Sequence, residues 1–147
     1  MSNIEKSYYI DRPKPEVFEF VSDPTNDPKW RESTVLSEWT SAGPPGVGST
    51  MRSVDKFLGR TLEYTLEITA WDPPNTYGAK ASSGPIPVDF TLKFESEGPG
   101  TRINLDGDIE LGGVFKMAGG LVRSQLDKQF DKEWAELKRI LEDSPST

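Results

Sequence analysis

Apolar residues spaced three and four apart mark the last long stretch of the chain, residues 115–142. On a helix with 3.6 residues per turn they fall on one stripe, and charged residues take the opposite side. The members of the stripe are Phe115, Gly119, Val122, Leu126, Phe130, Leu137 and Leu141, with Trp134 at its edge. This pattern predicts a long amphipathic helix.

Most of the chain before that helix alternates between apolar and polar residues, which is typical of strands with one wet face. In the clearest case Leu62, Tyr64, Leu66 and Ile68 point one way. The predicted strands are 4–10, 34–40, 49–57, 61–71, 77–82, 88–95 and 101–111. Two short helices are predicted between the first two strands, the second over 26–30 with an Asx cap. The fold class is therefore α+β, with the helix stripe packed on an antiparallel sheet.

Two features of the predicted helix interrupt its regularity. Gly119 lies near the middle of the stripe, although glycine costs roughly 1 kcal/mol relative to alanine inside a helix. Either the backbone approaches the sheet there or space is kept open. Glu133 falls on the apolar face. It is expected at the rim or paired with a strand Lys or Arg, and the alternative is a buried polar anchor for a ligand.

Composition limits the chemistry. The 147 residues carry a formal charge of −7 and include neither Cys nor His. This removes thiol nucleophiles, His bases and nearly every zinc site, so we expect no metal and no cofactor. The acidic balance argues against nucleic acid as a partner. Because no apolar run approaches the ~20 residues of a membrane span and no secretory signal is evident, we expect a soluble cytoplasmic protein without stable membrane insertion.

Two motifs are better explained by structure than by chemistry. Residues 43–50 have the glycine spacing of a phosphate-binding loop, but Ser49 stands where the lysine belongs and a strand follows, so a β-turn is predicted. Asp106, Asp108 and Glu110 alternate along one strand. They face away from Leu105 and are interpreted as a charged outer surface.

The aromatic residues are numerous for one small core, and ordinary packing accounts for most of them. Part of the set is expected to line a pocket between helix and sheet. The set comprises Trp30, Trp39, Tyr64, Trp71, Tyr77, Phe90, Phe94, Phe115, Phe130 and Trp134.

Several short motifs, in order along nearly the whole chain, resemble one family. They are the run 12–24 with Trp30 after it, Gly46-Val47-Gly48, Leu58-Gly59-Arg60, Asp72-Pro73-Pro74, Gly100-Thr101-Arg102 and the ending 137–142. Together they resemble the polyketide cyclase/dehydrase-type branch of the START-like (SRPBCC) superfamily. The resemblance implies a helix-grip fold, in which a seven-stranded curved antiparallel sheet wraps around a long C-terminal helix.

The resemblance also implies an apolar cavity that holds a lipid, a polyketide-like compound or another hydrophobic molecule. We expect one START-like domain over 1–143 with a frayed tail at 144–147, as a monomer or homodimer. Residues expected to contact the ligand are Trp30, Met51, Tyr64, Tyr77, Phe90, Phe115, Gly119, Val122 and Leu126.

Three functions remain open on the sequence. The first is binding of a small hydrophobic ligand. The second is a cyclase, aromatase or dehydrase activity in which Tyr, Asp or Glu and water move protons. The third is a module that regulates a protein partner, which predicts a filled cavity and an exposed apolar patch instead.

Overall fold

The computed structural model describes residues 4–57, 59–110 and 119–143, the last range with side chains from residue 123 onward. Strand β1 comes first, followed by two short helices and a one-turn 3-10 helix; six more strands precede the long helix α3. The elements are β1 (Ile4–Ile10), α1 (Lys14–Val21), η1 (Pro24–Asn26), α2 (Asp27–Trp30), β2 (Thr34–Trp39), β3 (Thr50–Phe57), β4 (Arg60–Asp72), β5 (Thr76–Ser83), β6 (Val88–Glu97), β7 (Gly100–Ile109) and α3 (Gly119–Asp143).

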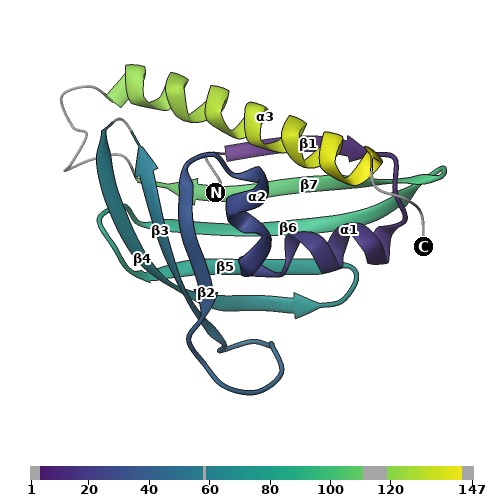
Figure 1. Ribbon diagram of the computed structural model, residues 1–147, viewed down its shortest axis with the longest axis horizontal. Helices are drawn as coiled ribbons and strands as arrows, with labels where there is room; N and C mark the ends of the chain where they lie inside the picture. Colours follow the sequence, from purple (N-terminus) through teal and green to yellow (C-terminus); the bar gives the residue numbers. More distant parts are fainter. Residues whose placement is uncertain (1–3, 58, 111–118, 144–147) are drawn as a thin grey trace.

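The strands form one antiparallel sheet in the order β1-β7-β6-β5-β4-β3-β2. The sheet curves into a half-barrel, and α1, α2 and α3 lie on its inner side (Figure 1). Register shifts interrupt the β2–β3 pairing near Thr34 and the β4–β5 pairing near Thr65 and Ile68. Such bulges bend a strand and raise its twist, which helps an open sheet to curve around a helix.

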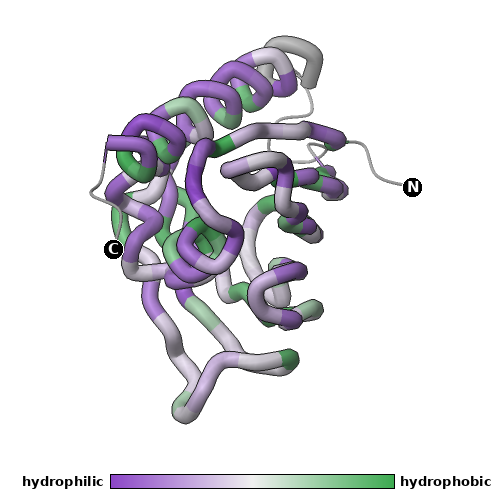
Figure 2. The backbone as a smooth tube through the Cα atoms, turned by 90° about the vertical axis from the view of Figure 1, so that its right-hand side faces the viewer, coloured by the Kyte–Doolittle hydropathy of each residue, from purple (hydrophilic) through white to green (hydrophobic). Residues whose placement is uncertain are grey.

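Alternation along the strands decides what the inner face contains. Tyr64 and Ile68 on β4, Leu92 on β6 and Ile103 on β7 are buried. Helix α1 closes one end of this core, where Phe18 meets Phe94 with ring centroids 5.2 Å apart. Figure 2 shows α3 running across one side of the curved sheet, with hydrophobic and hydrophilic residues alternating along its turns.

The predicted α+β helix-grip fold is confirmed, and the strand limits agree to within about two residues. The strand predicted over 101–111 ends at Ile109 in β7. The part of the predicted helix at 115–118, including Phe115, and Leu111 lie outside the described residues. The Asx cap is wrong in detail. Asn26 is at the cap position of α2 without a capping hydrogen bond, whereas Asp23 accepts one from the Thr25 backbone N–H and caps η1.

The glycine-rich loop before β3 is a turn, as predicted. Gly43 and Gly48 have positive φ angles of 87° and 94°, and the chain continues directly into strand β3. The Ser49 hydroxyl accepts a hydrogen bond from the Gly46 backbone N–H at 3.0 Å. The loop therefore supports its own turn with the serine that replaces the phosphate-binding lysine.

Candidate functional site

A cavity of about 190 Å³ lies between the inner face of the sheet and the first half and middle of α3. Most of its wall is apolar. Met51, Leu62 and Phe90 contribute from the sheet, and Leu126 and Phe130 contribute from α3. A wall of this kind offers little to well-hydrated solutes and favours apolar molecules.

Six of the nine residues predicted to contact a ligand line this cavity. They are Trp30, Met51, Tyr64, Tyr77, Phe90 and Leu126. Phe115 lies outside the described residues, and for Gly119 and Val122 the structure describes the backbone of α3 but not the side chain. The shared location of the six is a geometric observation, and their role in binding stays a prediction.

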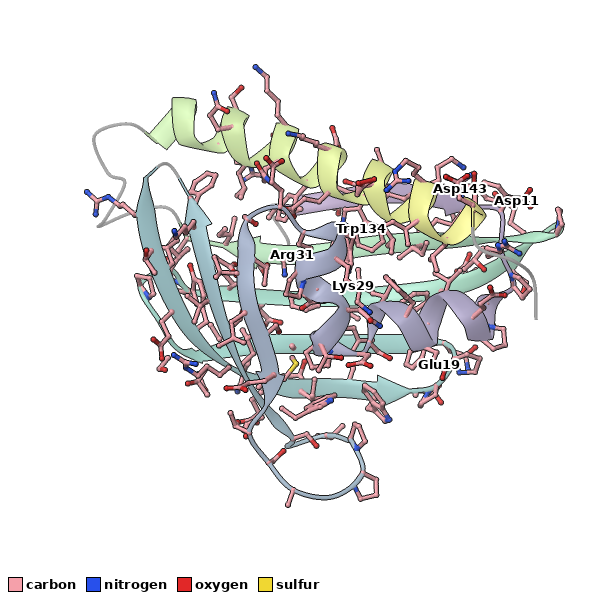
Figure 3. All side chains as sticks on the ribbon, viewed as in Figure 1. Asp11, Glu19, Lys29, Arg31, Trp134 and Asp143 are labelled. Carbon is pink, nitrogen blue, oxygen red and sulfur yellow. The ribbon has the colours of Figure 1, made fainter. Side chains whose placement is uncertain are left out.

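One side of the cavity is polar and centres on Arg31, which follows α2 in the chain (Figure 3). Arg31 Nε donates a hydrogen bond to Glu133 Oε1 at 3.4 Å, and its Nη2 lies 3.9 Å from Asp55 Oδ2. Burial by itself would lower the pKa of Arg31, but the carboxylates of Asp55, Glu133 and Asp27 together raise it. The guanidinium is therefore held charged beside an otherwise apolar space.

Glu133 is the carboxylate that joins α3 to the opposite wall. It is 2% exposed, and its Oε2 accepts hydrogen bonds from the Ser33 backbone N–H, the Ser33 hydroxyl and Gln129 Nε2 at 3.1, 2.8 and 2.7 Å. The expected rim position is wrong, because four donors compensate for the loss of water. The pairing with arginine is right, but Arg31 comes from the connection after α2 and not from a strand.

Two further carboxylates on the same side are less well compensated. Asp55 Oδ1 accepts a hydrogen bond from the Ser53 hydroxyl at 3.0 Å, and Asp27 Oδ2 accepts one from the Ser37 hydroxyl at 3.3 Å. Burial raises the pKa of Asp27 to about 7, against the opposing effects of Arg31 and Ser37. The Asp27 carboxyl thus changes its charge near neutral pH, which is unusual for an aspartate.

Tyr64 and Tyr77 are buried, with 8% and 6% exposure, and both line the cavity. Burial raises both pKa values, that of Tyr64 to about 12, so the phenols stay neutral. The Tyr77 hydroxyl donates to Met51 Sδ at 3.7 Å, a weak contact, and the Tyr64 hydroxyl has no hydrogen-bond partner among the described residues. Gly84 leaves room for the Tyr64 ring, since a Cβ at residue 84 would collide with it.

Sequence reasoning missed most of the polar residues of the cavity, among them Asp27, Arg31, Ser53 and Asp55. A signal was present for two of them. Ser53 and Asp55 lie between Met51 and Phe57 at every second position of β3. Their side chains therefore point to the same inward face as these two apolar residues. Asp27 and Arg31 are four residues apart, about one helical turn, with Trp30 between them in the chain. Nothing in this local pattern distinguishes them from a pair of charged residues exposed to solvent.

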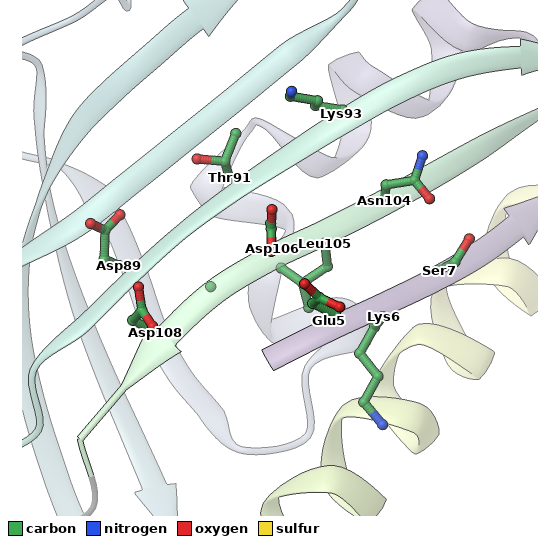
Figure 4. Close-up of a pocket in the computed structure, with 11 residues that line it drawn as sticks. Glu5, Lys6, Ser7, Asp89, Thr91, Lys93, Asn104, Leu105, Asp106 and Asp108 are labelled. Atoms are coloured by element: carbon green, nitrogen blue, oxygen red, sulfur yellow. The ribbon is translucent and has the colours of Figure 1, made fainter. Parts of the chain in front are cut away.

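A second hollow, of about 640 Å³, lies on the outer face of β1, β6 and β7 (Figure 4). Its wall carries Asp89, Asp106 and Asp108 together with Lys6 and Lys93. Asp106, Asp108 and Glu110 are exposed, as the alternation predicted. Although larger, this hollow is a charged surface open to water and lacks the apolar wall of the inner cavity.

Within the part of the chain that the structure describes, no group of three or more carboxylates is arranged to hold a metal ion. None of the described helices is both long and apolar enough to cross a membrane.

Comparisons with known proteins place the fold. The chain is similar to TTHA0849 from Thermus thermophilus, with a TM-score of 0.77 and 21% identity over 96% of this chain and 99% of that one. A START superfamily protein from Mycobacterium smegmatis gives a TM-score of 0.70 and 13% identity over 93% and 97%. The di-domain ARO/CYC BexL from the BE-7585A biosynthetic pathway gives a TM-score of 0.71 and 20% identity over 97% of this chain and 47% of that one. No curated protein matches the chain.

At these identities the solved structures establish the fold alone. The sequence itself matches the family model described as polyketide cyclase/dehydrase and lipid transport over residues 1–142. Since that match covers nearly the whole chain, the protein belongs to the polyketide cyclase/dehydrase and lipid transport family, within the START-like superfamily.

Proposed function

We propose that this protein binds a small hydrophobic molecule in the inner cavity, between the sheet and α3. The observation that carries the proposal is the cavity itself, about 190 Å³ with a mainly apolar wall. An apolar cavity of roughly 150 Å³ in another protein is large enough to bind benzene. The volume therefore suits a molecule of one ring, or two small ones, and not a long acyl chain.

The cavity also favours ligand binding over a role as a protein-interaction module. That alternative predicted a filled interior, whereas the space beneath Leu126 and Phe130 is open. Large apolar residues that are exposed in the described chain are Val35, Leu36 and Val47, on β2 and the following loop. Scattered residues of this kind are normal on a soluble surface.

Toluene is a suitable neutral probe for the proposal. Chemical shifts of the protein are followed during a toluene titration in the wild type and in Leu126→Trp, which places an indole in the cavity. Ser124→Trp is the matched control, because Ser124 is an exposed position on the same helix. We expect saturable shifts in the wild type and the control and none in Leu126→Trp. Absent shifts in the wild type, or equal shifts in all three proteins, would contradict binding in this cavity.

A second candidate function is proton transfer to a bound molecule, as in a cyclase or dehydrase. It is favoured by the Asp27 carboxyl, because a pKa of about 7 suits a general acid or base at neutral pH. If Asp27 acts in this way, Asp27→Asn abolishes turnover of a reactive polyketide-like substrate and leaves toluene binding intact. Equal turnover by the variant and the wild type would exclude this role.

A further inference from the structure

The charges around the inner cavity do not balance. Among the described residues of its wall, Arg31 is the one cation, and it faces the carboxylates of Asp27, Asp55 and Glu133. Asp89 and Asp108 also border the cavity but are exposed. Arg31 can offset one of the three inner charges, so the polar side of the cavity carries an excess of negative charge.

The three carboxylates differ in what compensates them. Glu133 has Arg31 and three further hydrogen bonds. Asp55 has the Ser53 hydroxyl and a guanidinium nitrogen 3.9 Å away, and its side chain keeps 17% exposure. Asp27 has one long hydrogen bond from Ser37 and the charge of Arg31, which it shares with Asp55 and Glu133. A partly buried carboxylate with so little compensation is stabilised either by a proton or by a cation that enters the cavity.

The Tyr64 hydroxyl lies in the field of both Asp55 and Arg31, and it is a second group of this wall with unused hydrogen-bonding capacity. A neutral phenol oxygen has lone pairs that accept hydrogen bonds. The wall thus offers carboxylate oxygens and a phenol oxygen as acceptors, next to the aromatic faces of Tyr77 and Phe90. Aromatic faces attract cations.

We propose that the cavity selects molecules that carry a protonated primary amine on a body of one ring or two small rings. The ammonium group presents three N–H donors, which suit Asp27, Asp55 and the Tyr64 hydroxyl, and its charge offsets the excess of carboxylate. The apolar body fills the space under Leu126 and Phe130. This inference rests on the proposed function and names the ligand class of the same site.

The same charges disfavour an acidic ligand. A carboxylate placed beside Asp27 and Asp55 meets two like charges, and Arg31 is already shared between Glu133 and Asp55. A neutral alcohol meets neither repulsion nor charge compensation. The predicted order of affinity is therefore amine, then alcohol, then carboxylate.

Three probes of matched size test this order: phenethylamine, 2-phenylethanol and phenylacetate. Their dissociation constants are measured at constant ionic strength from the chemical shifts of the four tryptophan indoles, two of which, Trp30 and Trp134, line the cavity. We expect phenethylamine to bind about tenfold more tightly than 2-phenylethanol, as for a charge-assisted hydrogen bond, and phenylacetate to bind most weakly.

Asp27→Asn and Asp55→Asn each remove one charge without changing shape, and each is expected to reduce the preference for the amine over the alcohol by about threefold or more. Asp11→Asn is the control, because Asp11 is an exposed aspartate that follows β1 and does not border the cavity (Figure 3). It should leave the ratio unchanged. The use of two independent variants keeps the test decisive if one of them fails to fold.

The pH dependence of the affinity for phenethylamine adds a second test, because a purely structural effect of the substitutions would not change it. Asp27 faces Asp23, Ser37, Arg31 and Asp55, and Glu133 and the two tyrosines complete the titratable groups of this side. Below about pH 6 Asp27 holds a proton, which an ammonium must displace, whereas the amine stays protonated like a lysine. Affinity for phenethylamine should fall as the pH is lowered from about 7.5 to 5.5, and this fall should be smaller in Asp27→Asn.

The outcomes separate the two proposals. If toluene binds but phenethylamine binds no more tightly than 2-phenylethanol, the selection of amines is wrong and the hydrophobic cavity remains. If the preference for the amine is equal in the wild type, Asp27→Asn and Asp55→Asn, these carboxylates do not provide it. If neither toluene nor any phenethyl probe binds, both the inference and the proposed function are wrong.

Discussion

Helix α3 is packed differently in its two halves. In the later half Leu137 is fully buried and does not border the cavity, whereas Trp134, which stacks on Tyr8 with ring centroids 4.8 Å apart, lies at the edge of the cavity. In the earlier half Leu126 and Phe130 are only partly buried and border the cavity. One amphipathic stripe therefore anchors the helix at one end and borders a cavity at the other. The comparison indicates that stability and binding depend on different residues of the same stripe.

The largest expected effect separates these halves directly. Leu137→Ala should lower the free energy of unfolding by about 2–5 kcal/mol, because it leaves a void in a closed part of the core. Leu126→Ala removes the same atoms beside an existing cavity and should cost less than about 1.5 kcal/mol. Urea denaturation measures both. Equal losses would mean that the two halves are packed alike.

Glu133 lies at the boundary between the halves, and its replacement tests whether a polar contact fixes that boundary. Glu133→Gln leaves Arg31 with a weaker partner and should cost about 2 kcal/mol. Asp131→Asn is the control on the same helix: Asp131 accepts from the Tyr8 hydroxyl at 3.0 Å but is exposed, so the change should stay within about 1 kcal/mol. Thermal unfolding of both variants at one pH would show whether the buried Glu133 carboxylate contributes more to stability than the exposed Asp131 carboxylate.

The pH dependence of stability tests the polar side of the cavity, where Asp27 lies. The pKa of Asp27 is raised from 3.8 to about 7 in the folded protein, so the folded state keeps this proton over a range where the unfolded chain has lost it. The stabilisation from that proton is complete below about pH 4 and disappears as the pH rises through 7. We expect a loss of about 4 kcal/mol across this range in the wild type, from 1.36 kcal/mol per pKa unit, and a smaller one in Asp27→Asn. A wild type and variant with parallel stability curves would contradict the raised pKa.

The smallest effects concern the two buried tyrosines. Tyr64→Phe removes a hydroxyl without a partner among the described residues, and Tyr77→Phe removes one that makes only the weak contact with Met51. Neither change should move the melting temperature by more than a few degrees. Affinity for phenethylamine should fall by about 0.5–1.5 kcal/mol in Tyr64→Phe. If both variants bind every probe as the wild type does, the tyrosines are part of the core and do not contact the ligand.

The fold followed from the sequence because alternation and helical spacing are local patterns. Leu62 to Ile68 on β4 reveal their buried face within seven residues, and the stripe of α3 repeats over several turns. The polar side of the cavity is different in kind. Arg31 and Glu133 are 102 residues apart, and only the curvature of the sheet and the crossing of α3 bring them together. No local pattern carries that information.

The pairing of β1 with β7 has a consequence for how this chain reaches its native state. Ile4 lies opposite Gly107, and Ile10 lies opposite Thr101, so the first strand finds its partner about a hundred residues later. Contacts of such long sequence separation slow folding, because the entropy of closing the loop is lost before the strands pair. During synthesis the first strand emerges long before β7 and α3 exist. Until they do, its apolar residues lack the strand that covers them and Arg31 lacks Glu133, and this interval is where the nascent chain is most exposed to aggregation and to chaperones.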